Sequence, residues 1–158
     1  MTKSIRRRRL ERKTDYKARL ALLKSGRPRL VIRKTNRYVI AQIIESDNVK
    51  DKVIFYSNSK DLLQKGWPKE LSGSLKSLPA AYLTGLALGK KAKDKVKLLV
   101  VDLGMYRNVH KSRIYAVVKG AIDSGLNVPA KSSVLPTEED LMRNEKTSEI
   151  FKKMKEKI

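Results

Sequence analysis

The segment that most limits the possible folds is the apolar run Leu98–Leu103 (LLVVDL), because a stretch of helical periodicity stands on each side of it. A continuous apolar run of this length is typical of a strand that is covered on both faces of a sheet. In the preceding stretch, residues 79–92, Ala80, Leu83 and Ala87 mark one face of a helix. A helix between two strands requires a crossover connection, so Leu98–Leu103 is predicted to run parallel to a neighbouring strand.

Three further strands are predicted nearer the N-terminus. The alternating segment Arg29–Lys34 (RLVIRK) is followed by the turn residues Thr35-Asn36 and by Arg37–Glu45 (RYVIAQIIE), which together indicate a hairpin. A third strand, Val53–Tyr56, follows a polar stretch in which Asp47-Asn48 suits a turn. These three strands are expected to be antiparallel.

A second amphipathic helix follows the apolar run. Large apolar residues recur at helical spacing until Gly125, at Ile114, Val117, Val118, Ala121 and Ile122. The element order is therefore βββαβα, and the predicted fold class is α/β, with helices packed on a mixed β-sheet.

The charge pattern divides the chain into three parts. Residues 1–37 contain 15 Lys and Arg against two acids, Glu11 and Asp15, so they carry +13 of the chain's formal +21. We predict a basic arm at residues 1–13, disordered until it binds, and an α/β domain at 14–136 that begins with a short helix ending near Gly26. Residues 137–158 have six acids and six bases and are predicted to form a charged helical tail.

Composition excludes several classes of protein. The chain has no cysteine and one histidine, so a disulfide scaffold, a zinc site or another cofactor site is not expected. The longest apolar-rich run, Leu78–Gly89, is too short to span a bilayer, and the N-terminus does not resemble a secretory signal. An intracellular location, without a membrane or a small-molecule substrate as partner, is expected.

The concentrated positive charge indicates a polyanionic partner. Such a charge repels itself in a compact fold and is most often neutralised by a phosphate backbone. The loop Met105–Arg113 adds two stackable rings and three cations, a mixture suited to RNA backbone and unstacked bases. A DNA- or RNA-packaging protein that is indifferent to sequence is an alternative interpretation.

Catalytic motifs are weak. The string Gly85–Lys90 falls one residue short of a phosphate-binding loop, and close helix packing explains its glycines better. Asp102, at the end of the apolar run, could serve a carboxylate-dependent nuclease, but a lone acid at a strand end is more often a cap or a loop anchor. His110 has no neighbouring nucleophile or acid with which to form a triad.

Several long strings resemble one family. Residues 6–20 (RRRRLERKTDYKARL) resemble the start of archaeal members of the ribosomal protein family numbered eighteen in the large subunit, and residues 27–42 (RPRLVIRKTNRYVIAQ) look like its first hairpin. Lys65–Trp67 with Pro79–Gly85 resembles the archaeal middle segment, and residues 102–129 resemble the last strand, loop and helix. The segment His110–Arg113 is bulkier than the glycine-containing segment expected there.

The resemblance implies a structural protein of the large ribosomal subunit, in the cytoplasm, and not an enzyme. It implies binding to 5S rRNA, attachment of that RNA to the large rRNA in the central protuberance, and contact with neighbouring ribosomal proteins. It also implies a sheet akin to the ribonuclease H motif without its acids. The rRNA-binding residues expected from the arm, the first helix, the hairpin and the loop are Arg6, Arg7, Arg8, Arg9, Arg12, Lys13, Tyr16, Arg19, Arg27, Arg29, Arg33, Lys34, Thr35, Asn36, Arg37, Tyr38, Tyr106, Arg107, Asn108, His110, Lys111 and Arg113.

Overall fold

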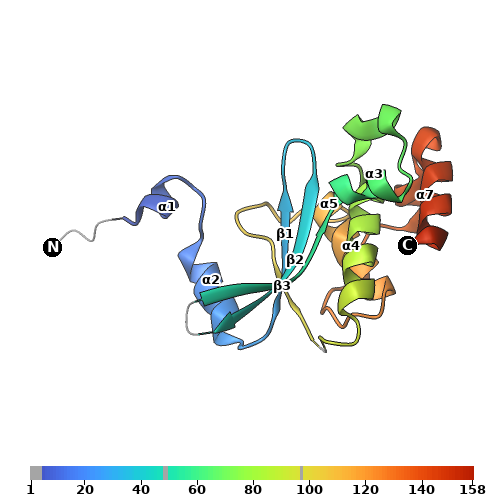
Figure 1. The fold of residues 1–158 in the computed structure, drawn as a ribbon. Helices are drawn as coiled ribbons and strands as arrows, with labels where there is room; N and C mark the ends of the chain where they lie inside the picture. Colours follow the sequence, from blue (N-terminus) through green and yellow to red (C-terminus); the bar gives the residue numbers. More distant parts are fainter. Residues whose placement is uncertain (1–4, 48–49, 97) are drawn as a thin grey trace.

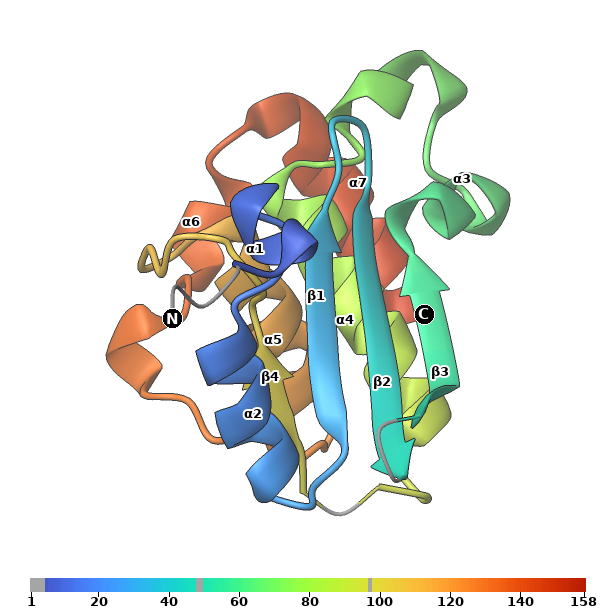
Figure 2. The same cartoon turned by 90° about the vertical axis from the view of Figure 1, so that its left-hand side faces the viewer.

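The computed structural model describes residues 5–47, 50–96 and 98–158, and is built around a four-stranded mixed sheet (Figures 1 and 2). The strands are β1 (Arg29–Lys34), β2 (Val39–Asp47), β3 (Lys50–Asn58) and β4 (Val100–Asp102), in the order β3-β2-β1-β4. Strands β1, β2 and β3 are antiparallel, and β4 pairs with β1 in parallel. The predicted α/β class, the mixed sheet and the crossover are confirmed. The first four residues of the predicted arm, and Asn48 of a predicted turn, lie outside the described residues.

The strands differ from the prediction mainly at their ends. Strand β1 has the predicted bounds, whereas β2 begins at Val39 because the preceding residues close the hairpin turn, in which the Tyr38 carbonyl accepts from the Thr35 amide at 2.8 Å. Strand β3 is longer than predicted, and β4 is shorter and lies at the edge of the sheet. The prediction that the apolar run forms a parallel strand is therefore confirmed, but the strand is shorter than predicted.

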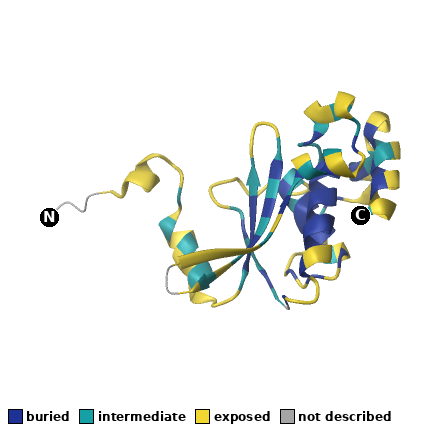
Figure 3. Ribbon diagram, viewed as in Figure 1, coloured by how far each residue is buried: buried dark blue, intermediate teal, exposed yellow. Residues whose placement is uncertain are grey.

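Helices cover the sheet on both faces (Figure 1). On one face lie α4 (Leu78–Ala92) and α5 (Arg113–Asp123), which bury the β-strand side chains Leu30, Ile32 and Ile43 completely. On the other face lies α2 (Tyr16–Lys24), which covers the side of the sheet formed by β1 and β4 (Figure 2). The hydrophobic core therefore lies between the sheet and the α4–α5 pair, as the dark blue of these elements in Figure 3 shows.

Helices α4 and α5 cross at glycines. A Cβ at Gly85 would overlap the carbonyl oxygen of Val117, and one at Gly120 would overlap the carbonyl oxygen of Tyr82. The predicted close packing at Gly85 is confirmed, and Gly120 is its counterpart on α5. Further along, Gly89 lies against Ala121 and Ser124, so the two helices run in the same direction and begin at the same end of the molecule.

The C-terminal segment forms α6 (Glu138–Met142) and α7 (Glu145–Lys157), with α7 packed on the outer side of α4 (Figure 1). The Phe151 ring meets the Tyr82 ring edge-on at 5.4 Å between centroids, and Leu141 and Met154 are also buried. The segment is helical and charged, and its apolar residues are part of the hydrophobic core. The division between a domain at 14–136 and a tail at 137–158 stays a prediction.

The remaining elements are short. They are α1 (Arg7–Leu10), the 3₁₀ turn η1 (Ser59–Asp61), α3 (Leu62–Lys65), η2 (Lys69–Ser74) and η3 (Ser132–Val134). The buried Trp67 indole donates to the Leu71 carbonyl at 3.2 Å and anchors the long connection between β3 and α4. Among the described residues, no helix is long and apolar enough to cross a membrane.

Candidate nucleic-acid interface

Helix α2 carries the basic arm onto the sheet. It forms where predicted, because the Asp15 carboxylate accepts hydrogen bonds from the amides of Lys17 and Ala18, and Gly26, at φ +62°, ends the turn after it. No residue of α2 is fully buried. An ion pair ties the helix to β3, with Arg19 Nη2 2.8 Å from Asp51 Oδ2. Polar contacts therefore help to hold α2 in its position on the sheet.

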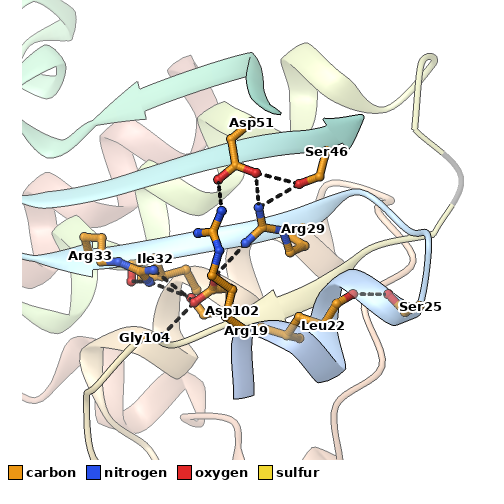
Figure 4. A network of polar contacts seen from close by, with 10 residues as sticks. All are labelled: Arg19, Leu22, Ser25, Arg29, Ile32, Arg33, Ser46, Asp51, Asp102 and Gly104. Carbon is orange, nitrogen blue, oxygen red and sulfur yellow. Dashed lines mark hydrogen bonds and ion pairs between the residues drawn. The ribbon is translucent and has the colours of Figure 1, made fainter. Parts of the chain in front are cut away.

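A buried arginine lies at the centre of these polar contacts (Figure 4). Arg29 is only 2% exposed, and its guanidinium donates to Asp102 Oδ2 at 3.1 Å, to Asp51 Oδ1 at 2.8 Å and to Ser46 Oγ at 2.8 Å. Arg29 was expected at an RNA-binding surface, but it lies under α2 and its charge is neutralised internally. Its burial therefore indicates a structural role for Arg29, which corrects its prediction as an RNA-binding residue.

Asp102 links the network to the loop after β4. Its Oδ1 accepts from Arg33 Nη2 at 3.0 Å and from the Gly104 amide at 2.8 Å, while Oδ2 accepts from Arg29. The carboxylate is thus held between two guanidinium groups and fixes the first residues of the loop. Its contacts are those of the loop anchor that the sequence favoured over a catalytic acid.

The pKa of Asp51 lies below its ordinary value of 3.8. Burial by itself raises this pKa, but hydrogen bonds from Ser46 and Arg19, together with the charges of Arg29 and Arg19, lower it by more. A carboxyl whose pKa is lowered in the folded state adds stability at pH values above its unfolded pKa, and this stability is lost as the pH falls through the folded pKa.

Asp51→Asn is therefore expected to lower the free energy of unfolding by about 1–2 kcal/mol at neutral pH, because buried Arg29 loses a charged partner. The difference from the wild-type chain should shrink as the pH drops below about 3.8. Urea unfolding at neutral and acidic pH measures both effects. Asp47→Asn, which changes an exposed acid on the same hairpin, should stay within about 0.5 kcal/mol of wild type. A stability difference that does not change with pH would contradict the assignment.

The arm contributes exposed cations. In α1 and the residues around it, no side chain is buried between Ile5 and Lys13. The Arg6 guanidinium lies 4.7 Å from the Tyr16 ring centroid, and Arg8 Nε donates to Thr14 Oγ1 at 2.9 Å. Glu11 pairs with Arg7 and Lys13, both at 2.7 Å. The arm therefore contacts the residues at the start of α2 through a cation–π contact and a hydrogen bond.

The hairpin and the loop after β4 meet at Tyr106. Its hydroxyl donates to the Lys34 carbonyl, and the Lys34 ammonium lies 5.7 Å from the centre of its ring. Further along the loop, Lys111 has φ +53° and pairs with Asp140 at 3.0 Å. The hydrogen bond from the Thr137 backbone and those from the Lys111 and Thr137 side chains lower the pKa of Asp140 to about 2.

Residues of all four predicted regions, namely the arm, α2, the hairpin and the loop, line one cavity. A hollow of about 570 Å³ is lined by Arg8 and Lys13 of the arm, Arg19 of α2, Arg33 of the hairpin and Tyr106 of the loop. These residues are far apart in the sequence, and Figure 2 shows the arm and α2 in front of β1 and β4. The fold thus brings cations from the arm, α2 and the hairpin, together with the loop tyrosine, to one side of the molecule.

The other predicted residues are distributed less evenly. Arg27 precedes β1 and so lies at the opposite end of that strand from the hairpin turn. Tyr38 is half-buried and packs against the core, whereas Tyr106 is 37% exposed. The exposed residues of the predicted set are Arg6, Arg7, Arg8, Arg9, Arg12, Lys13, Arg27, Thr35, Asn36, Arg37, Tyr106, Arg107, Asn108, His110 and Lys111, and the half-buried ones are Tyr16, Arg19, Arg33, Lys34, Tyr38 and Arg113.

Some residues that shape this surface were not predicted. Asp51 pairs with both Arg19 and Arg29, but an acid in the polar stretch before a predicted strand carries no local signal of such distant partners. Leu78 and Val109 line a second cavity beside the loop. Val109 had a signal in the sequence, because it is an apolar residue between polar ones in a loop, and it is 53% exposed.

Together, the fold and the surface define a basic α/β protein whose cations gather beside a mixed sheet, an arrangement typical of proteins that bind a phosphate backbone. A family described as "Ribosomal large subunit proteins 60S L5, and 50S L18" matches residues 2–100. This chain belongs to that family, as the sequence strings predicted. It is thus a protein of the large ribosomal subunit, with a structural rather than an enzymatic role.

Archaeal relatives support the same assignment over nearly the whole chain. The large ribosomal subunit protein uL18 of Korarchaeum cryptofilum is 46% identical over 151 residues, covering 95% of this chain and 75% of that protein. The uL18 proteins of Caldivirga maquilingensis and Methanococcus maripaludis are also 46% identical, over 85% of this chain and over 64% and 68% of their own lengths.

Proposed function

We propose that this protein binds 5S rRNA and helps attach it to the large rRNA in the central protuberance of the large ribosomal subunit. The observation that carries the proposal is the meeting of arm, α2, hairpin and loop around one hollow, whose lining includes four cations and two acids, Asp15 and Asp102. Cations from separate segments that face one space favour a folded, compact polyanion over a single extended strand.

The proposed interface keeps the predicted residues that reach the surface and omits Arg29. Arginines and lysines of the arm and hairpin would neutralise phosphates, while the exposed ring of Tyr106 suits an unpaired base. The same exposed rim, with its polar residues Thr35, Asn36 and Asn108, gives hydrogen-bonding groups between the cations.

We assign different roles to the arm and to the body because they differ in burial. An arm at residues 1–13 whose described residues bury no side chain is free to change shape on the RNA, and the body at 14–136 holds the hairpin and loop in place. The sheet of this body would correspond to a ribonuclease H-like motif, with Asp102 neutralised by arginines rather than arranged for catalysis. The helical segment at 137–158 would face neighbouring ribosomal proteins with its exposed side.

Competition between nucleic acids tests the proposal. Labelled 5S rRNA bound to the wild-type chain is titrated with unlabelled 5S rRNA, with tRNA, and with duplex DNA, all compared at equal phosphate concentration and at one salt concentration. Unlabelled 5S rRNA should displace the label at a far lower concentration than the other two, since only it offers the matching fold. Equal displacement by tRNA or by DNA would instead identify a packaging protein that is indifferent to sequence.

A further inference from the structure

A second cavity, of about 460 Å³, opens between the hairpin, the loop after β4 and the first turns of α4 and α5. Apolar groups from separate segments line it, namely Leu78, Tyr106 and Val109. Cations line it as well. Arg107 and Arg113 lie on its rim, while Lys111 is already paired with Asp140 and Lys34 lies beside the Tyr106 ring.

The apolar part of this cavity is exposed and held in place. Val109 is 53% exposed and Tyr106 is 37% exposed, so both keep apolar surface in water. The hydrogen bond from the Tyr106 hydroxyl to the Lys34 carbonyl fixes the ring against the end of the hairpin. A flat apolar group can therefore bind against the ring without the entropic cost of ordering it first.

The polar part is suited to an anion. Ser112 heads α5, and its side chain makes no capping hydrogen bond to the amides of the first turn. The first amides of α5 have no acceptor within the helix, and the positive end of the helix dipole points to this side. Arg113 and Arg107 add formal positive charge to the same rim.

We infer that this cavity receives one unstacked nucleotide of the bound RNA, with its base against Tyr106 and Val109 and its phosphate beside Arg107, Arg113 and the first amides of α5. This inference rests on the proposed RNA-binding function and adds a requirement to it. A duplex keeps its bases stacked and cannot fill the cavity, so the RNA must present an unpaired residue here. An apolar side chain of a protein partner would leave the arginines and the first amides of α5 without a ligand, and for that reason a nucleotide is favoured.

Filling the cavity tests the inference. Val109→Trp adds bulk without changing charge, and Tyr106→Ala removes the ring. Both variants should weaken the binding of labelled 5S rRNA roughly tenfold to a hundredfold, since stacking of one base on an aromatic ring has effects of this size. The slope of log affinity against log salt should fall by no more than about 0.7–0.9, because only the phosphate of this one nucleotide is lost while the contacts of the arm remain. Tyr106→Phe should bind within about threefold of wild type, because it keeps the stacking ring.

The matched control is Tyr56→Ala, which removes another exposed tyrosine, on β3 and outside this cavity. It should bind 5S rRNA as the wild-type chain does. Ultraviolet crosslinking of the wild-type complex, followed by mass spectrometry, should place a single nucleotide on a peptide that contains Tyr106.

The outcomes separate the two proposals. If the folded variants Val109→Trp and Tyr106→Ala bind like wild type, the nucleotide cavity is wrong while the 5S rRNA proposal stands. If the two variants bind RNA normally but lose a protein from reconstituted subunits, the cavity holds a protein side chain instead. If the wild-type chain shows no preference for 5S rRNA, both proposals fail.

Discussion

The variant with Arg6, Arg7, Arg8 and Arg9 all changed to alanine is expected to lose most of the salt dependence that the arm contributes to RNA binding. Each phosphate contact that is lost should reduce the slope of log K against log salt by about 0.7–0.9. If all four arginines contact phosphates, the slope should fall by roughly 3, and binding in about 50 mM salt should weaken by roughly a hundredfold or more. Titration of labelled 5S rRNA at several salt concentrations measures both quantities.

The structure supplies a matched control for the arm. Lys146, Lys152, Lys153 and Lys157 are exposed on α7, which lies on the far side of the sheet from the arm (Figure 1). Their replacement by alanine removes the same formal charge, so it tests whether position or total charge matters. The control should keep most of the wild-type slope. Equal losses in the two variants would show that binding follows net charge only, as in a packaging protein.

The arm variant should still fold. Its four arginines are exposed, and α1 buries no residue, so the free energy of unfolding is expected to stay within about 0.5 kcal/mol of wild type. A weakened complex would then report the lost contacts rather than a damaged body. Circular dichroism and urea unfolding check this expectation.

Gly120→Ala is expected to destabilise the body strongly. The added Cβ would overlap the carbonyl oxygen of Tyr82, which belongs to the backbone of α4 and cannot rotate away. The helices must separate, and core contacts between them are lost, at a cost of about 3 kcal/mol or more. An alanine in the interior of an exposed helix would instead add about 1 kcal/mol of stability, so the sign of the change identifies the crossing.

Urea unfolding measures the effect, with fluorescence of the single tryptophan, Trp67, as a probe because it is buried at 2% exposure. Gly73→Ala is the matched control, since its Cβ would meet no atom within 4 Å. It should change stability by less than about 0.5 kcal/mol. If Gly120→Ala were as stable as this control, α4 and α5 would not cross as closely as described.

The pattern of the sequence was sufficient for the elements that depend on local periodicity. Strand β1 has the predicted bounds, α5 follows the predicted apolar stripe, and the crossover to β4 makes that strand parallel to β1. The positive charge of the N-terminal region was also evident from the sequence, because counting charged residues is enough to establish it. The family was also predicted correctly, because the resemblance rests on long ordered strings rather than on three-dimensional contacts.

Other features depend on partners that are distant in the chain. Arg29 has the pattern of a surface cation in an alternating strand, but Asp51 and Asp102, from two other parts of the chain, neutralise it and allow its burial. The charged segment at 137–158 contains an apolar stripe that includes Phe151, and only the position of α4 shows what that stripe covers. Strand β4 lies at an edge because no further strand pairs with it among the described residues.

Local patterns thus predicted the four strands, helices α2, α4 and α5 and the basic region, but not the short helices α1 and α3. Propensity, periodicity and charge act over a few residues. Only the tertiary structure shows the ion pairs of Arg29, the packing of α7 on α4 and the cavity beside Tyr106. Each of these features brings together side chains that lie dozens of residues apart in the sequence. Pairing, burial and enclosed space are properties of side chains in contact, and contact between distant residues leaves no periodic trace in a single sequence.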